Sequence, residues 1–187
     1  MTQLDDLPIV RSARRVLQTE ANAILEMVDA LPDDFADVVE LLLKTEGRVI
    51  ISGVGKSGHI GRKISATLAS TGTPSYFVHA SEASHGDLGM ITSHDIVVLI
   101  SNSGETQELR DILIHTRRFN IPLIGISSKI NSTLLQSADY KLNLPNLPEA
   151  CAIGMAPTTS TTLTLAMGDA LAVAVMEQRG FGSEDFL

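Results

Sequence analysis

The segment Ile50-Ile51-Ser52-Gly53-Val54-Gly55-Lys56-Ser57-Gly58-His59 begins with an apolar, β-branched run that passes directly into a glycine-rich turn. A helical pattern follows from about residue 59. The glycines let backbone N–H groups approach an anion at a helix N-terminus, and Lys56 adds a positive charge there. The stretch therefore predicts a strand, an anion-binding turn and a helix, with Gly55, Lys56 and Ser57 at the ligand.

More short apolar runs follow this strand along the chain. They lie at residues 76–78, 96–100 and 123–126, with a weaker run at 140–144. Runs that do not alternate with polar residues are typical of strands buried on both faces, and hence of a parallel sheet covered by helices. Segments 59–71, 105–119 and 131–138 have helical length and spacing. The repeated order of strand and helix predicts an open α/β sheet with right-handed crossovers.

Helices are also predicted towards both ends of the chain. Residues 8–30 and 33–45 carry apolar positions at helical spacing, and a third segment runs from Ala156-Pro157 to Arg179-Gly180. Proline near the start and glycine after the end are common helix boundaries. The apolar stripes are wider than one sheet face can cover, so we expect a homo-oligomer, at least a dimer. Without a repeat or a linker, the sequence predicts one domain over residues 1–187, with an N-terminal helical segment at 8–45.

The composition excludes several classes of function. The net charge of −8 and the pI near 5.0 repel nucleic acid, and no basic cluster compensates for them. Residues 1–6 lack the features of a signal peptide, and no apolar run approaches the ~20 residues of a membrane span. The single Cys151 cannot form an intrachain disulfide. We expect a cytoplasmic protein whose phosphorylated ligand needs a local positive site, for which Lys56, Arg62 and Lys63 are candidates.

Two nucleotide-binding motifs overlap the glycine-rich turn, and neither fits. Residues 53–58 satisfy G-x-G-x-x-G, but a dinucleotide site also needs an acidic residue near the end of the next strand. That strand ends at His79-Ala80, and the nearest carboxylate is Glu82. A P-loop needs a glycine five positions before Gly55, where this chain has Ile50. We therefore expect no nucleotide cofactor.

A second polar turn follows the run at 96–100. Residues 101–106 supply three hydroxyls, an amide and a glycine directly after a buried strand. A single serine here would usually be a helix cap. Several donors together at a helix N-terminus favour a phosphate monoester instead. We therefore predict a phosphate site formed by Ser101, Asn102, Ser103 and Thr106.

Four segments of the chain share a pattern with a known family. They are Gly55 to His59, Ser84 to Met90, Ser101 to Glu108 and Ala156 to Ala172. Together they resemble the sugar isomerase (SIS) domain of D-arabinose 5-phosphate isomerases, from about residue 10 onwards. The resemblance implies a five-stranded parallel sheet between helix layers, in a three-layer αβα arrangement, and a homotetramer. It also implies interconversion of D-ribulose 5-phosphate and D-arabinose 5-phosphate, which feeds synthesis of the lipopolysaccharide sugar Kdo.

By the same resemblance, the catalytic residues are Lys56, Glu108, Glu149 and His85. The chemistry itself points to these residue types. Moving a carbonyl between C1 and C2 through an enediolate needs a base near both carbons and a group that stabilises the oxyanion. Glu108 or Glu149 could be the base, and Lys56 could stabilise the oxyanion with backbone N–H groups or His85. In a buried site we expect the pKa of the carboxyl to rise towards neutrality.

The sequence leaves other roles open for these residues. Glu108 falls in a first helical turn, where the helix dipole stabilises an acid, and Glu149 falls in a loop. Glu82, His85 and Asp87 share a loop, but no second histidine has a suitable spacing, so no metal is predicted. An isomerase of another ketose phosphate and a non-catalytic sugar-phosphate sensor remain alternative functions.

Relatives of this kind continue past the point where this sequence stops. The family places a functional histidine in a Ser-His-Pro-Gly-Gly segment there, and many relatives carry a pair of cystathionine-β-synthase-type (CBS-type) modules. Neither occurs in these 187 residues. We therefore expect the chain to represent a catalytic domain that lacks part or all of its activity when alone.

Overall fold

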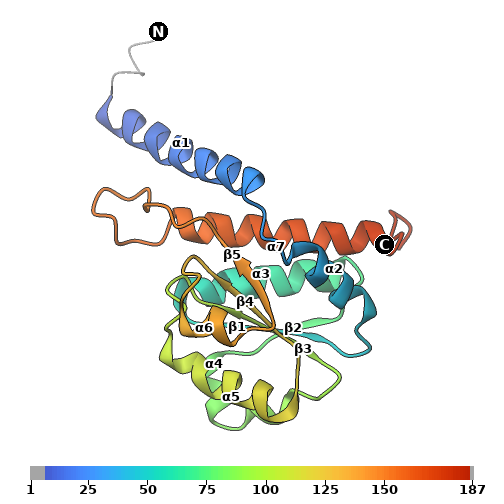
Figure 1. Cartoon of the computed structure of the whole chain (residues 1–187). Coiled ribbons are helices and arrows are strands. Elements are labelled where there is room, and N and C mark those ends of the chain that lie inside the picture. Colours follow the sequence, from blue (N-terminus) through green and yellow to red (C-terminus); the bar gives the residue numbers. More distant parts are fainter. Residues whose placement is uncertain (1–6, 186–187) are drawn as a thin grey trace.

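Five parallel strands form the middle layer of the computed structural model, which describes residues 7–185 (Figure 1). The strands are β1 (Val49–Gly53), β2 (Ser75–Phe77), β3 (Ile96–Ile100), β4 (Leu123–Ser127) and β5 (Tyr140–Asn143). They lie in the order β2-β1-β3-β4-β5, with every neighbouring pair parallel. The predicted five-stranded parallel sheet is therefore confirmed. Residues 1–6, on which the expectation of no signal peptide rested, lie outside the described residues.

The strands are buried on both faces, as their continuous apolar sequences predict. Every residue of β1, β3 and β4 is buried. Alternate side chains enter two separate cores: Val49 and Ile51 lie in one core, and Ile50 lies in the other. Each face of the sheet therefore needs its own cover of helices.

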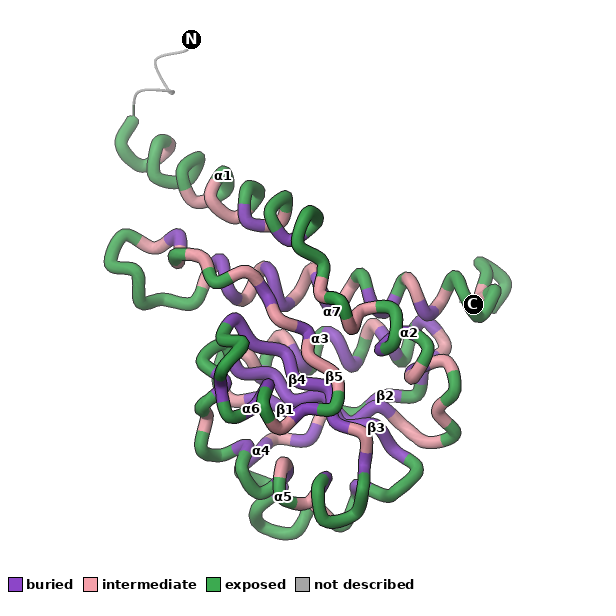
Figure 2. The backbone as a smooth tube through the Cα atoms, viewed as in Figure 1, coloured by how far each residue is buried: buried purple, intermediate pink, exposed green. Residues whose placement is uncertain are grey.

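Helices cover the two faces as separate layers (Figures 1 and 2). One face carries α1 (Pro8–Asp29), α2 (Phe35–Lys44), α3 (Gly55–Ser70) and α7 (Thr159–Gln178), with α1 outermost on α7. The other face carries α4 (Ala80–Ser84), α5 (Arg110–Phe119) and α6 (Thr133–Ser137). Two 3₁₀ helices, η2 (Asp87–Met90) and η3 (Gln107–Leu109), precede β3 and α5. The three-layer αβα arrangement agrees with the prediction.

α7 is the helix most enclosed by its neighbours, because it packs against α1, α2 and α3. Its buried residues include Leu163, Met167 and Leu171. Among the helices of residues 7–185, α7 alone is long and apolar enough, by length and composition, to cross a membrane. Burial beneath other helices gives a core helix the same apolar composition.

Three helices begin elsewhere than the sequence predicts. α3 begins at Gly55 rather than near residue 59, because Gly55 adopts a φ of 57° and turns the chain directly out of β1. α5 begins at Arg110, after the 3₁₀ turn η3. α7 begins at Thr159 rather than beside Pro157. α4 was not predicted, because its five residues are too few to reveal a helical period.

Candidate active site

The carboxyl ends of β1 and β3 lie side by side where the strand order reverses. Gly53 and Ile100 are register partners, while β2 lies on the far side of β1 and β4 on the far side of β3. Ligands of open α/β sheets bind at such a point. The two polar turns of the sequence, residues 54–58 and 101–106, follow these two strands. The fold therefore brings both predicted anion-binding segments to one place.

The turn at residues 101–106 is folded around the hydroxyl of Ser101, which is 2% exposed. Its Oγ accepts a hydrogen bond from the N–H of Gly104 at 3.0 Å and lies 2.7 Å from Oγ1 of Thr106. Asn102 and Ser103 are exposed, and Thr106 is half-buried. Ser101, predicted as a phosphate ligand, therefore shapes the turn from inside, and its neighbours offer the accessible donors.

The same turn is braced by the next strand-helix unit. The carbonyl of Asn102 accepts hydrogen bonds from the hydroxyls of Ser127 at 3.1 Å and Ser128 at 3.0 Å. The carboxylate of Glu105 accepts from the N–H and the hydroxyl of Thr133, both at 2.7 Å. These two bonds lower the pKa of Glu105. The turn thus has a defined shape before any ligand arrives.

Substitution of Gly104 is expected to damage this turn. Gly104 has a φ of 69°, and a Cβ there would lie 2.1 Å from Oγ of Ser132. We expect Gly104→Ala to weaken phosphate binding about ten-fold and to lower the free energy of unfolding by about 1–3 kcal/mol. Calorimetric titration with inorganic phosphate and urea unfolding measure the two effects. Gly89→Ala is the control, because its Cβ would meet nothing within 4 Å; equal phosphate affinity in both variants would contradict the prediction.

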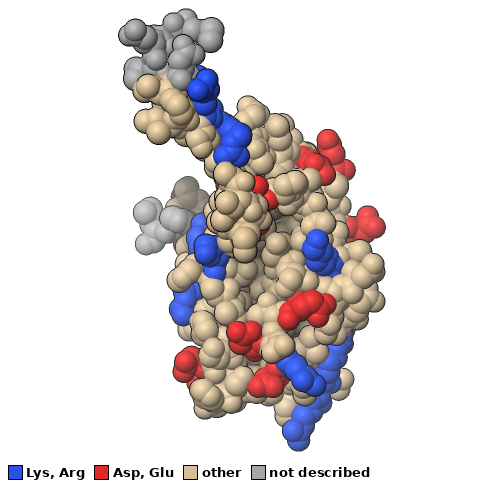
Figure 3. Space-filling view, turned by 90° about the vertical axis from the view of Figure 1, so that its left-hand side faces the viewer, with Lys and Arg blue, Asp and Glu red and all other residues tan. Residues whose placement is uncertain are grey.

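Lys56 lies in the first turn of α3, with its side chain exposed. Within residues 7–185 its ammonium has neither a hydrogen-bond nor an ion-pair partner. The other two predicted cations are engaged, since Lys63 pairs with Asp169 and the Arg62 guanidinium lies 4.3 Å from the centre of the Phe77 ring. In the view onto this edge, acidic and basic residues are interspersed (Figure 3). The predicted positive site therefore reduces to Lys56 and the start of α3.

Glu149 is held by the N-terminus of α7. Its Oε2 accepts from the N–H of Thr158 at 2.7 Å, the hydroxyl of Thr158 at 3.1 Å and the N–H of Ser160 at 3.2 Å. Its Oε1 accepts from the hydroxyl of Ser160. α3 and α7 run parallel, since Lys63 contacts Asp169 and Arg179 contacts Gly72. Both helices consequently begin at the same edge of the sheet, and Glu149 lies there as a fixed, half-buried carboxylate.

The pKa of Glu149 is lower than that of an ordinary glutamate. Burial acts to raise it, but the hydrogen bonds from Ser160 and Thr158 together outweigh burial. The expected rise of the pKa towards neutrality is therefore wrong for Glu149. The reason is that a helix N-terminus stabilises an anion through its free N–H groups. Glu149 is ionised at neutral pH, and its Oε1, with one bond, retains a lone pair.

The lowered pKa predicts a pH-dependent contribution to stability. This contribution is complete above the ordinary pKa of about 4.3 and disappears as the pH falls through the lower pKa of the folded state. The Glu149→Gln variant lacks this pH-dependent contribution to stability. We expect the gap in unfolding free energy between the native protein and Glu149→Gln to be about 1–3 kcal/mol at pH 7 and to shrink below about pH 4. Urea unfolding across this range measures the gap; a gap independent of pH would contradict the assignment.

His85 and Glu108 lie on neighbouring segments of the same edge. His85 is the C-cap of α4, and α4 packs against η3, which contains Glu108. Both side chains are exposed, and neither has a hydrogen-bond partner in the described part of the chain. The four predicted catalytic residues thus follow four different strands, β1, β2, β3 and β5. The fold gathers them at one edge of the sheet, and their catalytic roles stay predictions.

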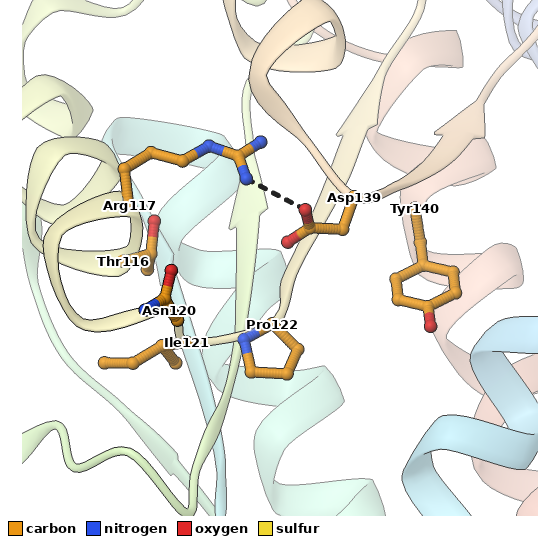
Figure 4. Close-up of a pocket in the computed structure, with 7 residues that line it drawn as sticks. All are labelled: Thr116, Arg117, Asn120, Ile121, Pro122, Asp139 and Tyr140. Carbon is orange, nitrogen blue, oxygen red and sulfur yellow. Dashed lines mark hydrogen bonds and ion pairs between the residues drawn. The ribbon is translucent and has the colours of Figure 1, made fainter.

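A cavity of about 300 Å³ borders the turn at residues 101–106 and is lined by Thr106, Leu113 and Leu134 among others. Another, of about 380 Å³, is lined by Pro122 and by the ion pair of Arg117 with Asp139 (Figure 4). Its residues Pro122 and Asp139 directly precede β4 and β5, so this cavity lies at the opposite, amino edge of the sheet.

The contribution of Thr158 and Ser160 was not predicted from the sequence. The hydroxyl-rich run from Thr158 to Thr164 after Pro157 is a signal for donors at a helix start. Which carboxylate they bind depends on the return of the chain from β5, which sequence spacing does not fix.

The fold and this edge define a class of protein: an open, parallel α/β domain with polar turns after β1 and β3 and a fixed carboxylate at the start of its last helix. The chain matches the SIS domain over residues 42–174. It belongs to the SIS domain family.

Two named proteins and one solved structure are similar to nearly all of this chain. The chain is 48% identical over 186 residues to arabinose 5-phosphate isomerase KdsD of Pseudomonas aeruginosa, covering 100% of this chain and 57% of the relative. It is 51% identical to the KdsD protein of Yersinia pestis, covering 94% of this chain and 54% of the relative. The chain thus spans about half the length of these relatives. The structure of E. coli CFT073 c3406 in complex with arabinose 5-phosphate superposes with a TM-score of 0.93 at 41% identity, covering 100% of this chain and 97% of that one.

Proposed function

We propose that this chain is an isomerase domain that interconverts D-ribulose 5-phosphate and D-arabinose 5-phosphate through an enediol. The observation that carries the proposal is the juxtaposition at one sheet edge of a preformed polar turn, a lysine without a partner among residues 7–185 and a fixed carboxylate. The names of the KdsD relatives and the arabinose 5-phosphate complex of a protein 41% identical support the choice of sugar.

In this proposal each group has a separate task. The phosphate binds at Asn102, Ser103 and Thr106, which places the sugar's carbonyl end towards Lys56 and Glu149. Lys56 stabilises the oxyanion of the enediolate, with His85 as a second donor. Gly55 and Ser57 supply the start of α3, whose N–H groups favour an anion.

Of the two predicted carboxylates, Glu108 and Glu149, Glu149 is assigned the base, because hydrogen bonds fix its position. Its Oε1 removes the proton from one carbon and returns it to the neighbouring carbon. A lowered pKa makes Glu149 a weak base, so Lys56 must lower the barrier by stabilising the enediolate. Glu108 is assigned proton transfer between the sugar hydroxyls. These steps require no cofactor and no metal.

A proton-exchange NMR assay tests the proposed function. The chain is incubated in D₂O with ribulose 5-phosphate, and in parallel with a hexulose 6-phosphate or sedoheptulose 7-phosphate. We expect deuterium at C2 of arabinose 5-phosphate and no exchange in the longer sugars. Exchange confined to a longer sugar would indicate the alternative isomerase. Binding of arabinose 5-phosphate without any exchange, also in a chain extended at its C-terminus, would indicate a sensor.

The cellular setting is part of the same proposal. We infer a cytoplasmic enzyme whose product enters Kdo and lipopolysaccharide synthesis, and we take residues 1–187 as one SIS domain. The resemblance to arabinose 5-phosphate isomerases supports the pathway, and the free thiol of Cys151 suits a reducing compartment.

We also propose that the chain is a homo-oligomer, a dimer at least and a tetramer by resemblance. α1 leaves large apolar side chains exposed: Ile9 is 75% exposed, and Leu17 and Val28 are each 67% exposed. Apolar side chains at such spacing on a helix usually face a partner.

Substitutions on this face are expected to change the assembly. Leu17→Glu with Val28→Glu should shift the protein to about 20 kDa in light scattering at micromolar concentration, while the native chain gives a multiple of that mass. Arg11→Glu changes an exposed polar position on the same helix and is the control. A native protein of 20 kDa would contradict the proposal.

A further inference from the structure

The loop that carries Glu149 is also held by a residue of the first helix. We call residues 149–158 the Glu149 loop. The guanidinium of Arg15, on α1, donates from Nη1 to the carbonyl of Ala150 at 2.7 Å. The two residues are 135 positions apart in the sequence. Arg15 thus reaches the peptide group directly after Glu149 from a different element of the fold.

Ala150 is fixed through both of its backbone polar groups. Its N–H donates to Oγ1 of Thr158 at 2.9 Å, and the same Oγ1 donates to Oε2 of Glu149. Its carbonyl accepts from Arg15, and the residue is 1% exposed. A continuous series of hydrogen bonds therefore connects the Arg15 guanidinium, through Ala150 and Thr158, to the Glu149 carboxylate.

The bond from Arg15 is of the stronger kind, because its donor is charged and its distance is short. Removal of the guanidinium leaves the carbonyl of a buried residue without this donor, and such a group tends to move towards water. The next residues are poorly anchored by packing, since Ile153 and Met155 are 76% and 79% exposed. The residues that follow Ala150 in the loop therefore contribute little packing that would hold the Ala150 carbonyl in place.

We propose that Arg15 is a positioning residue for the isomerisation, which holds Glu149 through the hydrogen bonds of Ala150 and Thr158. This inference rests on the proposed function. Arg15 touches no reacting atom, so its effect falls on the alignment of the base with the C1 and C2 protons. Misplacement of a reacting group by about 1 Å can cost a factor of about 100 in rate. Arg15 therefore acts on kcat, while phosphate binding at residues 101–106 is independent of it.

The test compares Arg15→Ala with Arg11→Ala, an arginine of the same helix whose guanidinium has no hydrogen-bond partner among residues 7–185. We expect Arg15→Ala to lower kcat about 10-fold to 100-fold with KM within about two-fold. Arg15→Lys, which retains one charged donor, should recover most of the loss. A kcat within two-fold of Arg11→Ala, or a rise in KM alone, would overturn the proposal.

A second measurement does not depend on turnover. The pKa of Glu149 is followed by ¹³C NMR of its carboxyl carbon in the native protein and in both variants. We expect Arg15→Ala to move this pKa up towards the ordinary value, because a loosened loop weakens the bonds from Thr158 and Ser160. An unchanged pKa would overturn the positioning role. If the native chain fails to isomerise ribulose 5-phosphate while the pKa still moves, the proposed function fails and the link from Arg15 to Glu149 stands.

Discussion

Glu149→Gln is expected to lower kcat for the interconversion of ribulose 5-phosphate and arabinose 5-phosphate by about 10²–10⁴-fold, the range that a positioned general base contributes. Glutamine keeps the size of the side chain but cannot accept the proton. Its amide N–H₂ would also face donors, because Thr158 and Ser160 present N–H and O–H groups to both oxygens of Glu149. KM should change much less, since the turn proposed to bind the phosphate, residues 101–106, follows β3 and does not include Glu149. Steady-state kinetics with a discontinuous sugar assay separates the two constants.

Asp95→Asn is the matched control for this substitution. Asp95 is a buried carboxylate that likewise accepts backbone bonds, from Arg48 and Thr92, both at 2.8 Å. It precedes β3, at the opposite edge of the sheet from the candidate site. Its loss should lower stability and leave kcat within about two-fold at a temperature where the variant is folded. If Glu108→Gln abolished turnover while Glu149→Gln retained it, Glu108 would be the base.

Lys56→Ala is expected to lower kcat about 10²–10³-fold, comparable to the loss of one oxyanion donor in other enzymes. Lys56 lies at the start of α3 without a partner in the described residues, so its charge is available to a ligand. Binding of arabinose 5-phosphate should weaken by less than this factor, because the enediolate carries more charge near Lys56 than the sugar does.

Lys63→Ala serves as the control on the same helix. Its ammonium is bound to Asp169, which leaves it no part in the proposed chemistry. We expect near-native kcat for Lys63→Ala and a small loss of stability, since an exposed ion pair contributes about 0–1 kcal/mol. Equal losses of activity in the two variants would point to a general effect of charge on α3 and would remove Lys56 from its assigned role.

Much of the fold could be predicted because its signals are local. The apolar runs at 50–51, 96–100 and 123–126 lie in β1, β3 and β4, and their lack of alternation correctly indicated a sheet covered on both faces. Helix boundaries were less predictable. The start of α7 at Thr159 depends on a carboxylate from the preceding loop, Glu149, whose bonds compete with simple continuation of the helix to Pro157.

The same distinction between local and long-range features applies to the candidate site. The sequence alone predicts the two polar turns, the place of Lys56 in the first of them and an anionic ligand, because a glycine or serine after a buried strand is a local feature that parallel sheets bring to one edge. Which charged groups are available to a ligand, and how basic they are, depends on the tertiary structure. In the folded chain Lys63 forms an ion pair with Asp169, and Ser101 is buried inside its turn. The tertiary structure also places Glu149 against the start of α7, so that its pKa falls rather than rises. The physical reason is that the pKa and availability of a group depend on donors and charges within a few ångströms, and these come from segments far apart in the sequence.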